Sequence, residues 1–398
     1  MDNRNYYIDR QLERLDPEKR EQLRRQVDSI DYTLFDALDH KDGETARGVI
    51  SPIGAVEVSD IQAHGAEYRA LGLEAIRAGK VGAVLLAGGQ GTRLGASGPK
   101  GAYNVGLTHD LYIFQCLIRN LLDVTDEAGV YVPLYVMTST VNHDQTAAFF
   151  REHGYFGYPE EYVKFFLQDM VPAVDFEGRI LMKNESELVL SPNGNGGWFS
   201  SMAKAGMLED VRARGVEWLN VFAVDNVLQR IADPVFVGAT IAAGCDSGAK
   251  VVRKSEPGEK VGVLCREDGK PSIVEYYELS DEMANLRKDN GDLVYGFGVI
   301  LNYLFSEKKL EEIMNTALPV HAVAKKIPYM DENGAAHAPT EPNGYKFETL
   351  VLDMVHMMDD CLAFEVVREK EFAPIKNLHG ADSVDSARRL LEQNGVTL

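Results

Sequence analysis

A cluster of glycines, a threonine and two basic side chains follows one apolar run in the first quarter of the chain. The run VLLA, residues 84–87, continues into GGQGTRLG, and Pro99, Lys100 and Gly101 come shortly after. Glycine lets backbone N–H groups approach phosphate oxygens without a Cβ in the way. A loop that also carries Arg93 and Lys100 can clamp a triphosphate, because guanidinium and ammonium groups bind phosphate oxygens. This pattern favours transfer of a nucleotidyl group.

Two common phosphate-binding loops do not fit the spacing. A dinucleotide fingerprint that begins at Gly89 needs glycine at its sixth position, where Leu94 stands. A P-loop needs GK[ST], and no such tripeptide follows. A nicotinamide-dependent oxidoreductase is therefore the weaker alternative.

Polar side chains end two other apolar runs. Asp225 follows residues 217–224, EWLNVFAV, and Gln168 ends the run VKFFLQ. In open α/β sheets, ligands lie outside the carboxyl ends of the strands, where a carboxylate could hold magnesium bound to substrate phosphates. Plainer interpretations stay open, namely Asp225 as the N-cap of a helix that begins near Val227 and Gln168 as a strand-end residue facing water.

The elements that must position these residues follow a β/α rhythm. Short aliphatic runs alternate with longer amphipathic ones over 81–168, and residues 217–253 repeat the pattern. We therefore expect an α/β fold with a Rossmann-like, mainly parallel central sheet flanked by helices. Helical spacing over residues 8–31 predicts N-terminal helices that pack on the surface.

Antiparallel additions are expected beside this sheet. Residues 176–191 alternate around a glycine turn and predict a hairpin, and residues 261–277 and 289–303 predict further strands with turns at EDG and DNG. The remainder, from about residue 303, is predicted to be mostly helical with one short strand near 361–368.

Composition excludes several classes of partner and site. The chain has 398 residues and 41 basic against 61 acidic side chains, a net charge of −20, which argues against nucleic acid and anionic membranes as partners. The charged N-terminus is unlike a secretory signal, and the longest apolar run, 235–245, is too short to span a bilayer. No zinc or disulfide spacing occurs among Cys116, Cys245, Cys265 and Cys361, so we expect a cytoplasmic protein.

With these residues in place, LAGGQGTRLG followed by PKG resembles the eukaryotic-type UDP-sugar pyrophosphorylases, most closely those for UDP-N-acetylglucosamine. Eight further blocks stand in the family's order over residues 50–378: FFLQDMVPA, SPNGNGG, VFAVDN, GAKVV, VGVLCR, VEYYE, KKIPY and FAPIKN. The resemblance implies a nucleotidyltransferase fold of the GT-A-like kind. It also implies the domains 1–75, an N-terminal helical segment, 76–378, the catalytic domain, and 379–398, a short helical tail without the family's C-terminal β domain.

The implied reaction makes UDP-sugar and pyrophosphate from UTP and a sugar 1-phosphate, with Mg²⁺ as cofactor and N-acetylglucosamine 1-phosphate as the expected substrate. The same reaction on glucose or galactose 1-phosphate is one alternative. A non-catalytic protein that binds UDP-sugars is another. We expect a monomer.

Site residues carry over from the matching motifs. The resemblance implies catalytic roles for Arg93, Lys100 and Lys376, and it implies Asp225 as the metal ligand. The nucleotide-binding residues would be Leu86, Gly88, Gly89, Gly91, Gln168, Gly194, Asn195 and Asp225. The sugar-binding residues would be Gly262, Glu275, Val299, Leu350 and Leu352.

Three of the sugar-binding positions depart from the family pattern. Val299 stands where the family for N-acetylglucosamine usually has asparagine, and Leu350 and Leu352 replace a pair of aromatic residues that lines the acetamide pocket. These changes bear on the choice of sugar and not on the binding of UTP.

Overall fold

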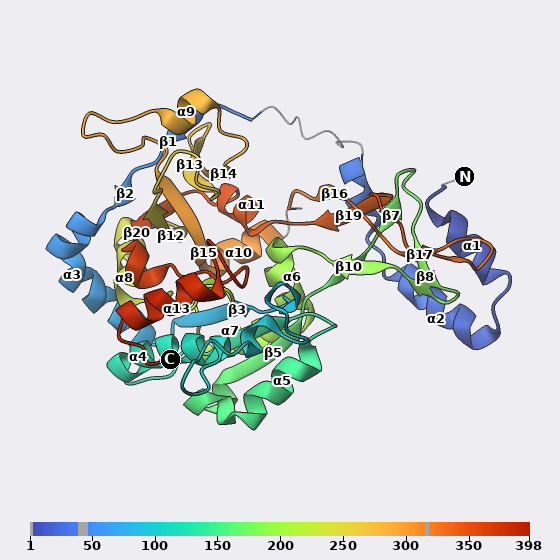
Figure 1. The fold of residues 1–398 in the computed structure, drawn as a ribbon, viewed down its shortest axis with the longest axis horizontal. Helices are drawn as coiled ribbons and strands as arrows, with labels where there is room; N and C mark the ends of the chain where they lie inside the picture. The colour runs from blue at the N-terminus through green and yellow to red at the C-terminus, as the bar shows by residue number, and fades with distance from the viewer. Residues whose placement is uncertain (1–2, 39–46, 315–317) are drawn as a thin grey trace. The chain divides into compact units, whose positions relative to one another are not determined.

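The short aliphatic runs become neighbouring strands of one sheet in the computed structural model, which describes residues 3–38, 47–314 and 318–398 (Figure 1). The main strand order is β2-β20-β12-β15-β11-β3-β4-β5, and β13, flanked by β1 and β14, pairs with β15. The bounds are β1 Ile50–Pro52, β2 Ala55–Val56, β3 Val81–Leu86, β4 Leu134–Thr138, β5 Val163–Leu167, β11 Trp218–Ala223, β12 Ser247–Arg253, β13 Val263–Glu267, β14 Lys270–Val274, β15 Phe297–Ser306 and β20 Cys361–Glu365.

Parallel pairing dominates the main strand order. Strands β11, β3, β4 and β5 are parallel neighbours, as are β12, β20 and β2, and β15 runs antiparallel to both β11 and β12. Every residue of β3 and β4 is buried, which is typical of parallel strands covered on both faces. The predicted mainly parallel α/β sheet is confirmed, as is the antiparallel β13–β14 hairpin.

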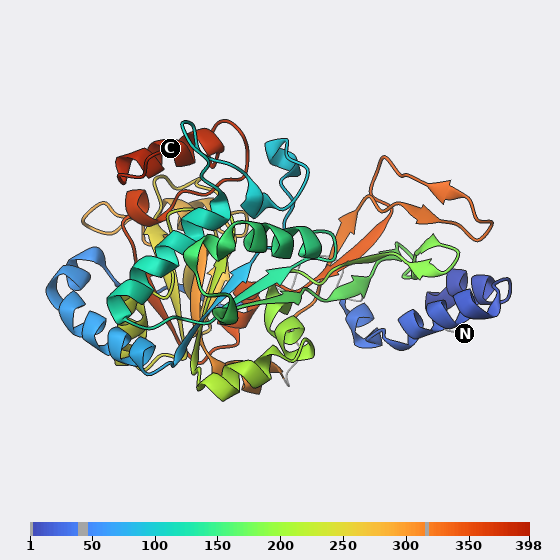
Figure 2. The same ribbon diagram turned by 90° about the horizontal axis from the view of Figure 1, so that it is seen from below.

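Helices cover this sheet, and Figure 2 shows α4 and α5 in front of its strands. Helix α4 buries Phe114, Leu117 and Leu121 on one face and ends at Gly129, whose left-handed φ of 76° favours glycine. The helices from α3 onward are α3 Val58–Arg77, α4 Ile113–Ala128, α5 His143–Glu152, α6 Trp198–Lys204, α7 Met207–Arg214, α8 Pro234–Ala243, α9 Asp281–Asn285, α10 Glu307–Met314, α11 Val351–His356, α12 Arg368–Glu371 and α13 Val384–Gln393.

The chain divides by contacts into two units that each gather segments distant in sequence. The larger unit, which holds the sheet, consists of Gly48–Leu167, Phe199–Thr316 and Met354–Leu398. The smaller unit consists of Met1–Arg47, Gln168–Trp198 and Ala317–Asp353. The domain boundaries predicted at residues 75 and 378 stay predictions.

The smaller unit has its own core beneath the predicted N-terminal helices. Helices α1 (Tyr6–Leu12) and α2 (Pro17–Asp28) are present, and Leu23 is buried with Ile180 and Phe347. The strands of this unit are β6 Met170–Pro172, β7 Val174–Asp175, β8 Met182–Asn184, β9 Glu187–Leu188, β10 Leu190–Pro192, β16 His321–Lys325, β17 Tyr329–Met330, β18 Ala336–His337 and β19 Gly344–Glu348.

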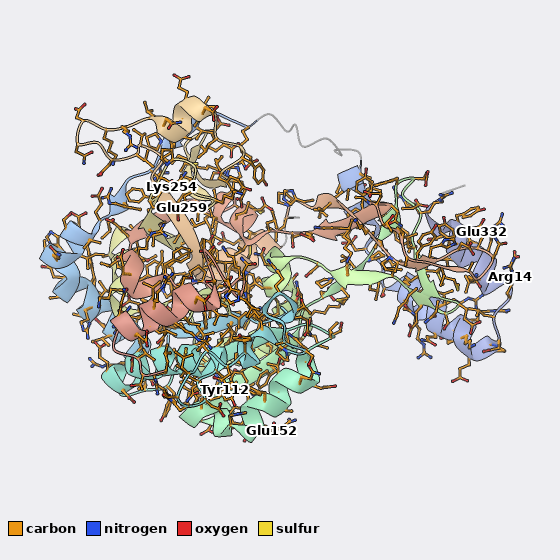
Figure 3. The ribbon with its side chains drawn as sticks, viewed as in Figure 1. Arg14, Tyr112, Glu152, Lys254, Glu259 and Glu332 are labelled. Carbon is orange, nitrogen blue, oxygen red and sulfur yellow. The ribbon has the colours of Figure 1, made fainter. Side chains whose placement is uncertain are left out.

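The prediction of a mostly helical segment after residue 303 is wrong in part. Strand β19 pairs with β16 and β7, and β17 pairs with β18 and β8, so partners lie up to about 170 residues apart. Strands of two to five residues are too short to show a clear local period, and two of their partners, β7 and β8, lie far away along the chain. Nearby, Arg14 donates a hydrogen bond to the carbonyl oxygen of Glu332 at 2.7 Å (Figure 3).

The predicted hairpin at 176–191 is also more complex than expected. Residue Gly178 closes one turn, where its N–H donates to the Asp175 carbonyl oxygen. A second turn joins β8 to β9, whose residues Asn184 and Glu187 are partners.

Glycines let helices α3 and α8 pack closely in the larger unit. A Cβ at Gly72 would lie 1.8 Å from the carbonyl oxygen of Pro234, and a Cβ at Gly238 would lie 1.7 Å from that of Tyr68. Neither backbone oxygen can move without separating the helices. Because α8 also contacts β12 and β20, this packing ties α3 to that part of the sheet through α8.

We expect Gly238→Ala to destabilise the protein by about 1–3 kcal/mol in urea unfolding, because overpacking outweighs the gain in helix propensity. The matched control is Gly65→Ala on α3, where the nearest atom would be the Ile61 Cγ2 at 3.5 Å. That control should be neutral or stabilising by up to ~1 kcal/mol. Equal effects of the two substitutions would contradict close packing at Gly238.

Candidate active site

The glycine-rich loop after β3 is closed by its own backbone. The Gly91 N–H donates to the Gly98 carbonyl oxygen at 2.9 Å, and the Lys100 N–H donates to the Gly89 carbonyl oxygen at 3.1 Å. Between them Gly95 has a left-handed φ of 72°, which favours glycine. These bonds fix where Arg93 and Lys100 leave the backbone.

A buried asparagine that the sequence analysis missed fastens this loop to β4. Asn142 is fully buried, and its side-chain N–H donates to the carbonyl oxygens of Ala87 at 2.9 Å and Gly89 at 3.3 Å. Its Oδ1 accepts the Ser139 N–H at 2.9 Å. A polar residue just after a buried strand was the available signal.

Four of the predicted site residues come together beside this loop. The Lys100 Nζ lies 3.8 Å from the Asp225 Oδ2, and both side chains are largely buried. Burial lowers the pKa of Lys100; the nearby charges of Arg93 and Lys376 lower it further, and Asp225 opposes them. Hence Arg93, Lys100, Asp225 and Lys376 form one cluster with three cations.

Asp225 lies in a turn beyond the carboxyl end of β11, as predicted. The Gln229 side chain closes this turn by donating to the carbonyl oxygens of Ala223 at 2.7 Å and Asn226 at 2.9 Å. The alternative role of Asp225 as an N-cap is wrong, because no helix begins in the described segment between Asp225 and Pro234, where Asp233 caps α8.

Hydrogen bonds hold the segment of Lys376 against the turn that contains Asp225. The Ile375 N–H donates to the Asp225 carbonyl oxygen at 2.9 Å. The buried Asn226 side chain donates to the Glu371 carbonyl oxygen at 2.7 Å and accepts the Ala373 N–H at 2.9 Å. Asn226, which the sequence analysis did not single out, therefore joins the turn of Asp225 to the segment of Lys376.

A buried ion cluster lies at the base of the same segment. Lys250, in the GAKVV motif, is fully buried and contacts Asp233 at 3.1 Å and Glu371 at 2.5 Å. Burial raises the pKa of Glu371, while the Lys250 charge acts in the opposite direction. The sequence indicated the GAKVV motif, but only the structure shows that its lysine, Lys250, pairs with Glu371 and holds it in place.

The predicted sugar-binding residues of the larger unit form a second cluster. The Val299 N–H donates to the Gly262 carbonyl oxygen at 2.9 Å. A Cβ at Gly262 would lie 3.5 Å from the Val299 Cγ2 and 3.7 Å from a Glu275 carboxylate oxygen. Gly262, Glu275 and Val299 are thus neighbours.

Leu86 ends β3 beside the glycine-rich loop, whereas the predicted residues Gln168, Gly194, Asn195, Leu350 and Leu352 belong to the smaller unit. The Gln168 side chain donates to the Gly194 carbonyl oxygen at 2.8 Å and is buried, so the alternative of a glutamine facing water is wrong. The Asn195 Oδ1 accepts the Val351 N–H at 3.0 Å, directly after Leu350. Leu352 follows in α11 and is half-buried.

Two features bear on metals and membranes. Within residues 3–38, 47–314 and 318–398, no group of three His, Cys, Asp or Glu side chains could hold a metal ion. Over the same residues, every helix is too short or too polar to cross a membrane.

Comparisons with known sequences give one family. The family described as UTP–glucose-1-phosphate uridylyltransferase matches residues 50–397. The human UDP-N-acetylhexosamine pyrophosphorylase-like protein 1 is 43% identical over 326 residues, which cover 80% of this chain and 64% of that protein. The Saccharomyces cerevisiae UDP-N-acetylglucosamine pyrophosphorylase is 40% identical over 336 residues, 81% of this chain and 70% of that protein. The chain spans slightly less than two thirds of the length of the first curated relatives that it matches.

The fold is shared with solved structures. That of the UDP-N-acetylglucosamine pyrophosphorylase from Trypanosoma brucei in complex with an inhibitor has a TM-score of 0.82 and 29% identity, and it covers 98% of this chain and 82% of that chain. The predicted resemblance is confirmed. The chain belongs to the UTP–glucose-1-phosphate uridylyltransferase family.

Proposed function

We propose that the chain is a uridylyltransferase that makes UDP-sugar and pyrophosphate from UTP and a sugar 1-phosphate. The observation that supports this most is the gathering of Arg93, Lys376 and Asp225 near Lys100. Both substrates are polyanions, so their reaction needs positive charge that is already in position. The names of the human, yeast and Trypanosoma relatives support the same chemistry, and those of the yeast and Trypanosoma proteins favour N-acetylglucosamine 1-phosphate.

The cations suit the changes of charge in this reaction. A phosphate oxygen of the sugar 1-phosphate attacks the α-phosphorus of UTP; a new P–O bond forms, and the bond to the bridging oxygen of the pyrophosphate breaks. Negative charge therefore grows on the leaving group. The planar guanidinium of Arg93 can bind two of its oxygens, and Lys100 and Lys376 would neutralise the remaining phosphates. No covalent nucleophile is needed.

Asp225 fits the role of protein ligand to magnesium. Mg²⁺ at phosphate-transfer sites is usually held by one or two carboxylates, with substrate phosphates and water as the other ligands. The Asp225 side chain is 25% exposed and caps no helix, so its carboxylate can take this part. When bound, the ion would neutralise phosphate charge.

The other contacts are proposed from the family motifs. Gln168, Gly194 and Asn195 would bind uridine, together with Leu86 and the loop glycines Gly88, Gly89 and Gly91. The Gln168 amide offers both a donor and an acceptor for the uracil edge.

We propose that selectivity for the sugar depends on five residues, Gly262, Glu275, Val299, Leu350 and Leu352. Glu275 would accept hydrogen bonds from sugar hydroxyls. Because the Val299 side chain has no amide, a contact to the sugar would be lost there, so glucose or galactose 1-phosphate stays the alternative substrate.

An end-point assay tests the reaction. We expect UTP and Mg²⁺ to release pyrophosphate only when a sugar 1-phosphate is present, fastest with N-acetylglucosamine among the N-acetylglucosamine, N-acetylgalactosamine, glucose and galactose esters. Excess EDTA should abolish the release. If none of the four gives product while UDP-N-acetylglucosamine still raises the melting temperature, the protein binds UDP-sugars without catalysis.

Removing Arg93 should impair turnover with the fold intact. We expect Arg93→Ala to lower kcat by roughly 10²–10³-fold, the usual effect of losing one donor to developing negative charge. Arg93→Lys should recover only part of it, because lysine lacks the planar fork. Arg119→Ala, on the exposed face of α4, is the control. Equal activity of Arg93→Ala and Arg119→Ala would refute the role of Arg93.

The lowered pKa of Lys100 gives a pH prediction. Lys100 loses its charge at a lower pH than an ordinary lysine, so kcat/KM should fall as pH rises through that lowered value. Lys100→Arg keeps its charge at all these pH values and should shift the alkaline fall to higher pH. The exposed Lys308→Arg is the control. An unchanged alkaline limb in Lys100→Arg would assign the fall to another group.

A further inference from the structure

The loop that follows Lys376 folds back on it, and one acidic residue of this loop, Asp382, makes the contacts. The N–H groups of Lys376 and Asn377 both donate to the Asp382 carbonyl oxygen, at 2.6 Å and 3.1 Å. The Lys376 Nζ also donates to the Asp382 Oδ2 at 2.8 Å. One residue thus holds both the backbone and the ammonium group of a lysine in the cation cluster.

Asp382 is itself held in an uncommon conformation by a rigid neighbour. Its φ of 50° lies in the left-handed region, which few residues other than glycine, asparagine and aspartate adopt. Ser383, fully buried, follows it as the N-cap of α13 and accepts the Ser386 N–H at 3.2 Å. The Asp382 carboxylate is therefore presented from a helix start, a fixed point in the larger unit.

The contact between Lys376 and Asp382 also balances charge, besides closing the loop. Arg93 and Lys376 are close enough to Lys100 for their positive charges to lower its pKa, and like charges repel. Without phosphates, Lys100 pairs with the carboxylate of Asp225, and Lys376 pairs with that of Asp382. The Asp382 pair is 42% and 40% exposed, so it is a weak ion pair that a phosphate can replace.

We propose that Asp382 is a positioning residue that holds the Lys376 ammonium group in the free protein and releases it to a substrate phosphate. This inference rests on the proposed function. It implies that the Asp382 charge competes with phosphate for Lys376. Binding of pyrophosphate is then an exchange of one anionic partner for another.

The substitution Asp382→Asn tests the exchange. Asparagine tolerates the left-handed backbone and keeps an oxygen that can accept from Lys376, so the loop should stay closed. Only the competing charge is lost. We expect the Kd for pyrophosphate with Mg²⁺, measured by calorimetry, to fall roughly two- to fivefold, the factor that an exposed ion pair is worth. The gain should shrink in high salt, which screens exposed charges.

Two controls separate exchange from a general change in charge. Asp385→Asn removes the same charge three residues further on, where the carboxylate pairs with His379 at 2.6 Å, and should leave the Kd within about twofold. In a Lys376→Ala background, Asp382→Asn should no longer tighten binding. A role confined to loop closure would leave affinity unchanged or weaker in Asp382→Asn, and that result would overturn the inference.

Measuring the Kd for pyrophosphate needs no turnover. Its outcome is therefore independent of whether the proposed reaction is correct. If no sugar 1-phosphate gives product but Asp382→Asn binds pyrophosphate more tightly, the reaction is wrong and the exchange stands. If the protein turns over and Asp382→Asn shows no tighter binding, the exchange is wrong. If the unsubstituted protein binds no pyrophosphate, both are wrong.

Discussion

Holding three cations together before any phosphate arrives is the constraint on which the candidate site depends. Arg93, Lys100 and Lys376 come from two segments about 280 residues apart, in a chain with a net charge of −20. Their mutual repulsion is on the order of a few kcal/mol for charges several ångströms apart near a protein surface. The carboxylates of Asp225 and Asp382 offset part of it. The structure around these residues must supply the rest of the restraint.

Buried amides and one buried ion cluster supply that restraint. Asn142 ties the glycine-rich loop to the end of β4, and Asn226 ties the turn of Asp225 to the segment of Lys376. Lys250 anchors Glu371 at the base of that segment. Because each of these buried polar groups has its partners, the network is rigid, and removing one member would leave others unsatisfied. Such a network keeps the cations in place without using the groups that would contact substrate.

Sequence patterns predicted those parts of the protein that depend on residues close together along the chain. The aliphatic runs that become β3, β4 and β5 carry their own signal, and so does a glycine-rich loop with Arg93 and Lys100 beside it. Asp225 could be placed at a strand end but not distinguished from an N-cap. Strands β16–β19 were missed because each is only two to five residues long and two of them, β17 and β19, also pair with the distant strands β8 and β7. Asn142 and Asn226 look in sequence like ordinary turn residues.

The sequence by itself determined that this is an α/β protein of the UDP-sugar pyrophosphorylase kind, because its motifs are contiguous and stand in the family's order. Only the tertiary structure decided which residues hold those motifs in place, and that Lys376 faces an aspartate of its own loop. The physical reason is that these bonds join segments far apart along the chain, so the geometry of each depends on the whole sheet and leaves no trace in local composition.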